Sequence, residues 1–260
     1  MPQVINKKAV ADSFSKAASH YDQFAQLQRD IGDQLIDGIS VQLPAKVIDL
    51  GCGTGYFSEK LSTLFPHTSL TCFDLSVEML TQAKKRNIDD ANFQQGDIDY
   101  LPFHKNSVDL IYSNLVVQWS ADLASCLNQV KNSLKEGGVF HFSTLLVGTL
   151  DELTQAWKVV DNNPHTNRFL SKEIIESILK SIGFSAVKIK TETKVLQYEN
   201  VIEVMRALKG IGANHVHGHK TQKVTGRNLI KQLEAGYQPY KNSDGRLNLT
   251  YQVCYIEVIK

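Results

Sequence analysis

Three alternating glycines, Gly51, Gly53 and Gly55, stand where the apolar run Lys46–Leu50 gives way to a helical pattern. Glycine has no Cβ and tolerates positive φ, so the backbone of such a turn can come close to a ligand. A nicotinamide-binding fingerprint needs its third glycine at position 56, where Tyr56 stands instead. The spacing therefore favours a ligand without a pyrophosphate at this turn; a tight turn that binds nothing is the alternative.

Acidic residues follow the next two apolar runs. Asp74 lies 23 residues beyond Gly51, where a carboxylate can accept two hydrogen bonds from a ribose. Asp97 follows the third run and can accept from an exocyclic amine, with Met79 and Ile98 on the two faces of an adenine. A surface aspartate at a strand end is the alternative for Asp74.

These residues need a sheet to hold them, and the pattern from Ala45 to Leu145 supplies one, since short apolar runs alternate with helical stretches as in βαβ units. A helix over Ala121–Leu134 is expected to stop at the glycine pair Gly137-Gly138, and another to follow the cap Ser76. Right-handed crossovers place ligands at the carboxyl edge, with Asn114 at the switch point beside the first strand. The predicted strands are Lys46–Leu50, Ser69–Leu75, Asn92–Gln95, Val108–Ser113 and Val139–Thr144.

The segments on either side of this core extend the same chain into one domain. Two amphipathic helices meeting at His20-Tyr21-Asp22 are expected before residue 45. The residues after 145 are expected to form substrate-cap elements and closing strands, so that 1–260 is a single unit with its core at 45–145. The predicted later elements are helices at Asp151–Asp161, Ser171–Ile182 and Val201–Leu208, a strand at Ala186–Val195, a loop rich in Gly, His and Lys, and a strand in the last ten residues.

Composition excludes several classes of protein. The chain has 260 residues and a net charge of +1, which gives no reason to expect a nucleic acid partner. No apolar run approaches the length of a membrane span, and the first residues do not look like a secretory signal, so a cytoplasmic protein is expected. Four scattered cysteines without a CxxC pair are expected to be buried, reduced thiols.

Taken together, the GCGTG turn, Asp74 after the second strand, Gly96-Asp97-Ile98 after the third and the later glycine pair resemble the class I S-adenosylmethionine-dependent methyltransferases. The resemblance implies an α/β, Rossmann-like sheet, mostly parallel with an antiparallel C-terminal strand, plus helical cap elements. It also implies S-adenosyl-L-methionine as cofactor and no metal. The cofactor-binding residues expected on this basis are Gln28, Arg29, Asp49, Gly51, Cys52, Gly53, Gly55, Asp74, Leu75, Met79, Asp97, Ile98 and Asn114.

The flanking segments resemble one family within that class more closely. Phe14–Ala18, Ser113–Trp119, Leu150–Trp157, His165–Leu170 and Leu208–Asn214 are similar to the malonyl-acyl-carrier-protein O-methyltransferases of biotin synthesis. That family implies methylation of the free carboxylate of a malonyl thioester, with malonyl-acyl-carrier protein as partner. The His-rich segment after Asn214 departs from the motifs known for it.

A malonyl carboxylate has a pKa several units below 7, so it is already the nucleophile and needs no general base. The site must instead position it, which is worth up to about 7–11 kcal/mol of the barrier. Arg168 is expected to bind the carboxylate, and its alternative is an ion pair with Asp161. Tyr21 is expected to donate to the carboxylate or close over the methyl group, and its alternative is an aromatic plug between helices.

Other residues carry weaker expectations. Trp119 and His165 are expected to contact the substrate, although Trp119 and Trp157 can equally be core residues. Gln28 and Arg29 can also be plain surface residues of an amphipathic helix. The alternative enzyme is a methyltransferase of the same fold that acts on another small carboxylate or on a quinone-like ring. A ring acceptor would need a base, for which His165 is the candidate. A non-enzymatic module that binds the cofactor or the carrier protein is the remaining alternative.

Two clusters in the second half of the chain complete the hypotheses. His215, His217 and His219 alternate, which permits a metal site in a strand, but a plain loop is the simpler interpretation. Residues 1–150 hold 12 basic and 16 acidic side chains, whereas residues 151–260 hold 16 and 11. A basic docking face for the acidic carrier protein is therefore predicted in the second half, or else a merely solvated face, at Lys209, Lys220, Lys223, Arg227 and Lys231.

Overall fold

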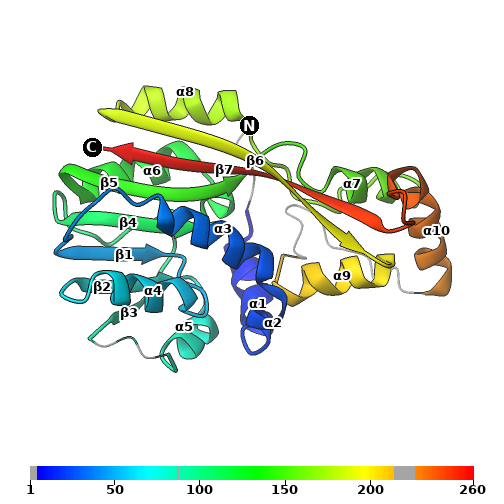
Figure 1. Ribbon diagram of the computed structural model, residues 1–260, viewed down its shortest axis with the longest axis horizontal. Coiled ribbons are helices and arrows are strands. Elements are labelled where there is room, and N and C mark those ends of the chain that lie inside the picture. The colour runs from blue at the N-terminus through cyan, green and yellow to red at the C-terminus, as the bar shows by residue number, and fades with distance from the viewer. Residues whose placement is uncertain (1–4, 87, 89, 214–225) are drawn as a thin grey trace.

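The computed structural model describes residues 5–86, 88, 90–213 and 226–260. Its strands form one sheet in the order β3-β2-β1-β4-β5-β7-β6, and Figure 1 shows them one above another, from β3 at the bottom to β6 at the top. The first five strands are parallel, and β7 runs antiparallel to both β5 and β6, which confirms the predicted α/β class. The strands are β1 (Lys46–Leu50), β2 (Ser69–Asp74), β3 (Asn92–Gln95), β4 (Val108–Asn114), β5 (Leu134–Leu145), β6 (Ala186–Tyr198) and β7 (Leu247–Ile259).

One boundary prediction was wrong. Helix α6 (Leu123–Ser133) runs directly into β5, so Gly137 and Gly138 lie inside the strand and do not stop the helix. The pairing of β5 with β4 shifts register here, between Val108 and Leu110, and Gly137 has a φ of +72°. The glycines therefore permit an irregularity in the pairing of two strands. A sequence pattern does not distinguish such an irregularity from the end of a helix.

Two hydrophobic layers sandwich the sheet. Helices α3 (Gln26–Asp37) and α4 (Tyr56–Leu64) bury Leu35 and Leu61 against one face. Helices α6 and α8 (Lys172–Ile182) bury Val130 and Leu179 against the other. These layers fix the strands, so that the carboxyl ends of β1 and β4 form the rigid edge where the predicted switch point lies.

The N-terminal helices cross this edge of the sheet. Figure 1 shows α1 (Lys7–Ala17) and α2 (Tyr21–Phe24) beyond the arrowhead of β1. The predicted junction of two helices at residues 20–22 is therefore itself a short helix, α2, between α1 and α3. Helix α5 (Val77–Ala83), capped by Ser76 as expected, packs against α1 from the sheet side.

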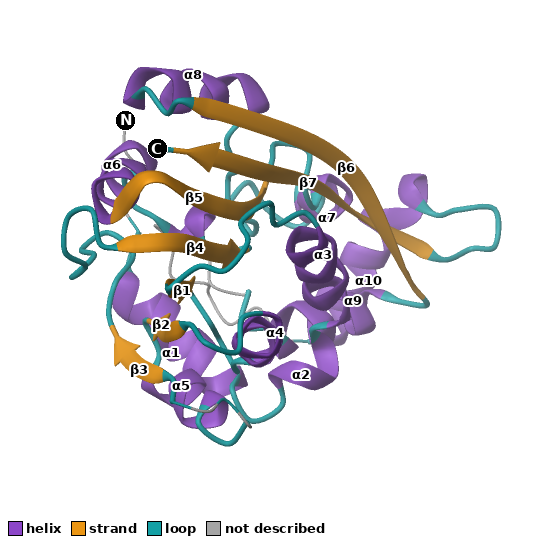
Figure 2. Cartoon of the chain, turned by 60° about the vertical axis from the view of Figure 1, so that its left-hand side comes forward, coloured by secondary structure: helices purple, strands orange, loops and turns teal. Residues whose placement is uncertain are grey.

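Strands β6 and β7 extend beyond the rest of the sheet. Strand β7 pairs with β5 only from Val253 onward, while β6 and β7 remain paired from Leu247. The resulting two-stranded ribbon carries α7 (Asp151–Trp157), α9 (Val201–Gly210) and α10 (Arg227–Tyr237), as seen in Figure 1 and Figure 2. The chain forms helix α10 where the sequence interpretation extended a loop; its apolar residues Leu229, Leu233 and Tyr237 recur at four-residue spacing and pack into the core.

Other expectations concern the chain as a whole. All four cysteines are free and buried, as predicted. Among the described helices, none has the length and apolarity that crossing a membrane requires. The three histidines at 215, 217 and 219 lie outside the described residues.

Candidate functional site

The glycine turn after β1 opens toward empty space at only one of its glycines. Gly51 has a φ of +78°, and a Cβ there would lie 2.3 Å from a Val116 methyl carbon. Gly53 also has a positive φ, but a Cβ there would meet no protein atom within 4 Å. Gly53 thus leaves a space that a side chain would fill, which is the geometry of backbone that lets a ligand come close.

Gly55 has a different part in the turn. It is the N-cap of α4, with a φ of +79°, and a Cβ there would come within 2.8 Å of Ala83 on α5. It lines neither of the cavities described below. Of the three glycines, Gly51 and Gly53 line these cavities, whereas Gly55 permits close packing between α4 and α5.

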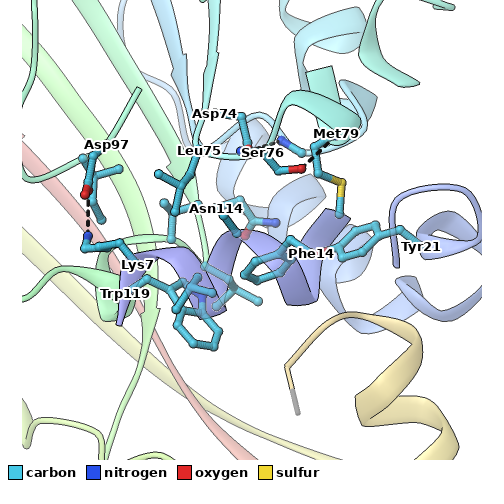
Figure 3. Close-up of a pocket in the computed structure, with 17 residues that line it drawn as sticks. Lys7, Phe14, Tyr21, Asp74, Leu75, Ser76, Met79, Asp97, Asn114 and Trp119 are labelled. Atoms are coloured by element: carbon cyan, nitrogen blue, oxygen red, sulfur yellow. Dashed lines mark hydrogen bonds and ion pairs between the residues drawn. The ribbon is translucent and has the colours of Figure 1, made fainter. Parts of the chain in front are cut away.

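A cavity lies between α1 and the carboxyl edge of the sheet, and we call it the α1 cavity (Figure 3). Asp74 and Asp97 stand at its sheet side, and Phe14 and Trp119 face them in an edge-to-face pair with centroids 5.4 Å apart. Its lining residues are Lys7, Val10, Ala11, Phe14, Tyr21, Gly51, Gly53, Asp74, Leu75, Ser76, Met79, Asp97, Ile98, Asn114, Leu115, Val116 and Trp119. It is a largely apolar slot with carboxylates on its sheet side.

The two carboxylates are held in place by backbone and by α1. Asp74 accepts from the amide nitrogens of Gly53 at 2.9 Å and Ser76 at 2.8 Å. Desolvation nevertheless raises the pKa of Asp74 above its usual value. The Lys7 ammonium lies 2.7 Å from Asp97 and 2.7 Å from Asp99.

Helix α1 is attached over its cavity at both ends. Lys7 binds the acids after β3 at one end, as Figure 3 shows for Asp97. At the other end the Ser15 hydroxyl lies 2.9 Å from that of Ser76 and 2.5 Å from Glu78. The helix therefore lies across the cavity as a cover.

A second cavity lies between α2 and the glycine turn, and we call it the α2 cavity. The side-chain oxygen Oε1 of Gln28 is buried there without a hydrogen-bond partner among the described residues. Asp49 is 2% exposed, and burial raises its pKa to about 7 despite a hydrogen bond from Ser58. Its lining residues are Tyr21, Asp22, Ala25, Gln28, Arg29, Asp49, Gly51, Cys52, Gly53, Thr54, Tyr56, Phe57 and Asn114.

Tyr21, Gly51, Gly53 and Asn114 line both cavities and so mark their junction. The Asn114 amide is fixed there, because its nitrogen donates to the Gln28 carbonyl at 2.8 Å and its oxygen accepts from Ser143 at 2.7 Å. Desolvation, aided by the carboxylates of Asp74 and Asp22, raises the pKa of Tyr21. The phenol is therefore a protonated hydrogen-bond donor.

The structure does not bring every expected residue to these cavities. Arg168 is exposed and lines neither. His165 lines neither cavity; its ring stacks on Trp157 at 3.6 Å between centroids, and its Nε2 lies 2.8 Å from Asp161. Asp161, the expected alternative partner of Arg168, thus binds His165, and Trp157 is a buried core residue.

Several residues that line the two cavities were not predicted from the sequence. Lys7 faces the α1 cavity together with the rest of one helix face, Val10, Ala11 and Phe14. Their spacing of three, four and seven residues was visible in the sequence, but it indicates only a buried stripe and not what it covers. Asp22 and Thr54 had no signal of their own, because their role depends on α2 lying against the glycine turn.

Comparison with known proteins agrees with this geometry. A family model described as a methyltransferase domain matches residues 44–203. A putative methyltransferase structure from Bacillus halodurans has the same fold, with a TM-score of 0.64 and 15% identity over 88% of this chain and 97% of that one.

Relatives with higher identity are named either for malonyl-acyl carrier protein O-methylation or for biotin biosynthesis. The malonyl-acyl carrier protein O-methyltransferase of Serratia marcescens is 38% identical over 96% of this chain and 95% of its own. The biotin biosynthesis bifunctional protein BioHC of Teredinibacter turnerae is 36% identical over 98% of this chain and 47% of its own, so the chain spans about half of that relative. The chain belongs to the malonyl-acyl carrier protein O-methyltransferase family, within the class I S-adenosylmethionine-dependent methyltransferases.

Proposed function

We propose that this chain transfers a methyl group from S-adenosyl-L-methionine to the free carboxylate of malonyl-acyl carrier protein, giving the methyl ester at an early step of biotin synthesis. Family membership supports the reaction class. The observation that carries the proposal is the position of Tyr21. This residue of α2 lines both cavities, as do the glycine turn and Asn114, and its hydroxyl is protonated.

The residues of the two cavities fit the cofactor. In the α1 cavity, Asp97 suits the adenine amine and Asp74 the ribose hydroxyls, with Leu75, Met79 and Ile98 around the base. In the α2 cavity, the unpartnered Oε1 of Gln28 suits an ammonium donor. Arg29, Asp49 and Cys52 also line that cavity. When bound, the cofactor supplies an electrophilic methyl group.

For the acceptor, the protein then needs to provide little beyond orientation of the carboxylate. A malonyl carboxylate is ionised at neutral pH and attacks without a base. Tyr21 donates a hydrogen bond to one carboxylate oxygen and leaves the other free to attack. A neutral donor orients the carboxylate and leaves most of its negative charge available for attack. A full ion pair would neutralise that charge and make the carboxylate a weaker nucleophile.

Arg168, Trp119 and His165 are proposed to act further out. Arg168 lies two residues before Leu170, which bridges to Leu146 at the end of β5, so it stands beside the carboxyl edge of the sheet. We propose that it guides the charged acceptor inward rather than binding it at the methyl group. Trp119 would contact the thioester arm, and His165 would shape the approach through its stack on Trp157.

A ring acceptor is the poorer candidate. It would need a base near the methyl group, and His165, the expected base, lines neither cavity.

The carrier protein is proposed to dock on the cap. Lys209 on α9 and Lys231 on α10 are exposed, and these two helices contact each other. Arg227 begins α10, whereas Lys220 and Lys223 lie outside the described residues. The chain is proposed to act in the cytoplasm as one methyltransferase unit.

A direct assay tests the function. Purified protein is mixed with methyl-labelled cofactor and malonyl-acyl carrier protein, and the product is treated with mild base. We expect label in a base-labile methyl ester on the carrier. Absence of that ester under conditions where the cofactor binds would reject the proposal, and malonyl-coenzyme A in a parallel reaction determines which thioester is preferred.

A further inference from the structure

Arg86, just beyond α5, contacts two parts of the site although it lines neither cavity. Its Nε donates to the carbonyl oxygen of Thr54 at 2.7 Å, in the glycine turn. Its Nη2 donates to Asp22 Oδ2 at 2.5 Å, on α2, and its Nη1 to Glu59 at 3.0 Å, on α4. The guanidinium also lies 5.4 Å from the ring centroid of Tyr56.

The carboxylate of Asp22 accepts hydrogen bonds both from the glycine turn and from Arg86. Oδ1 accepts from the Thr54 hydroxyl at 2.6 Å, while Oδ2 accepts from Arg86. The Asp22 carbonyl accepts from Arg29 on α3 at 2.6 Å. One residue of α2 is thereby tied to the glycine turn, to the end of α5 and to α3.

Helix α2 depends on such ties. It has four residues, too few for a helix to be stable by itself, and the side chain of His20 at its N-cap makes no capping hydrogen bond to the helix. Its far end is packed by Phe24, which lies where a side chain of Gly210 would be. The end that carries Tyr21 is held through the neighbouring Asp22.

The electrostatics of Arg86 also favour α2 in its docked position. Its Cδ lies 3.4 Å from where a Gly55 Cβ would be, at the N-terminus of α4, where the helix dipole disfavours a cation. Glu59 and Asp22 compensate that charge. With Asp22 displaced, the guanidinium would face the helix terminus with one carboxylate less.

We propose that Arg86 is a positioning residue for methyl transfer: through Asp22 it holds Tyr21 at the junction of the two cavities. Because Thr54 shares the same carboxylate, the position of Tyr21 is coupled to the glycine turn. This inference rests on the proposed function, and Arg86 acts in it without touching either reactant.

Kinetics provide the first test. Arg86→Gln should lower kcat about 10- to 100-fold, the cost of displacing a positioned group by about 1 Å, with smaller changes in acceptor KM and in cofactor affinity by calorimetry. Tyr21→Phe should add little in the Arg86→Gln background, because residues acting as a unit are not additive. Arg86→Lys, which keeps a cation for Asp22, should recover part of the loss.

Lys60→Gln is the matched control. Lys60 also lies over the Tyr56 ring, at 4.9 Å, and pairs with Asp33 on α3 at 2.5 Å, so its ion pair among the described residues is to α3 and not to α2. Its variant should keep the kcat of the parent. A Lys60→Gln loss equal to that of Arg86→Gln would assign the effect to general surface charge.

Hydrogen exchange provides a readout independent of turnover. The amides of Tyr21–Phe24 should exchange faster in Arg86→Gln, and in Arg86→Lys if the glutamine variant does not fold, but not in Lys60→Gln. Unchanged exchange, additive kinetic effects or an equal loss of cofactor affinity would overturn the proposal. If the parent protein makes no methyl ester, the proposed function fails while exchange still tests whether Arg86 holds α2.

Discussion

At the scale of single residues, Gly51 and Gly53 are two positive-φ glycines in one turn that differ in what surrounds them. An alanine at Gly53 costs about 1–2 kcal/mol for its left-handed conformation, but its methyl group enters the space shared by the two cavities. Gly53→Ala should therefore abolish measurable cofactor binding while lowering Tm only slightly. Gly51→Ala, whose methyl would overlap Val116, should lower Tm much more. Calorimetric titration and thermal melting check both, and equal melting losses would contradict this assignment.

Asp49 adds a pH dependence at the same scale. Its folded pKa of about 7 exceeds the value of about 3.9 for an unfolded aspartate. Between these values the folded chain holds a proton that the unfolded chain has lost, so the free energy of unfolding falls as pH rises toward 7. In the cofactor-free protein, Asp49→Asn should remove that slope and stabilise the fold above pH 7 by up to about 4 kcal/mol. Urea unfolding across this pH range measures it, and a variant with the parent's slope would refute the assignment.

At the scale of elements, the sequence pattern predicted the strands and turns that depend on local contacts. It did not predict side-chain pairs between residues far apart in the sequence. The core strands and their turns follow from alternation along the chain, so Asp74, Asp97 and Asn114 were placed at the strand ends. Lys7 and Arg86 were missed because their acidic partners are distant in the sequence: Asp97 is 90 positions from Lys7, and Asp22 is 64 positions from Arg86. The turn of β5 at Gly137 was misjudged because glycine marks helix ends and strand irregularities alike.

The cover formed by α1 makes a testable prediction at this scale. Lys7→Met keeps the apolar stem but removes both ion pairs to the acids after β3. We expect the cofactor to dissociate faster, by about fivefold, since a partly exposed pair contributes on the order of 1 kcal/mol. Stopped-flow displacement measures the rate, with Lys8→Met, at an exposed neighbouring position, as control. Equal rates in the two variants would mean that α1 does not retain the cofactor.

At the scale of the whole molecule, the proposed reaction centre lies at the rigid sheet edge, and the ribbon of β6 and β7 carries separate helices beside it. Our proposal assigns the cofactor to the core and the carrier protein to the surface that α7, α9 and α10 provide. The charge division seen in the sequence matches this division of the fold, because all three helices and the ribbon belong to the basic second half.

Carrier docking is the prediction that belongs to this scale. Replacing Lys209 and Lys231 together by Glu should raise KM for malonyl-acyl carrier protein about 3- to 10-fold with little effect on kcat. KM for malonyl-coenzyme A, which lacks the protein surface, should change less. Lys180→Glu on α8, an exposed lysine on another face, serves as the charge control. An equal rise in KM for both thioesters would argue against a protein-docking face.

The central claim is that Tyr21 orients an ionised carboxylate at the junction of the two cavities. Its most direct test is the single-turnover rate of methyl transfer in the parent and in Tyr21→Phe, with cofactor affinity measured on the same samples. Losing one oriented donor should slow transfer about 100-fold while cofactor affinity stays nearly unchanged. Transfer at the parent's rate, or a loss explained entirely by weaker cofactor binding, would contradict the account.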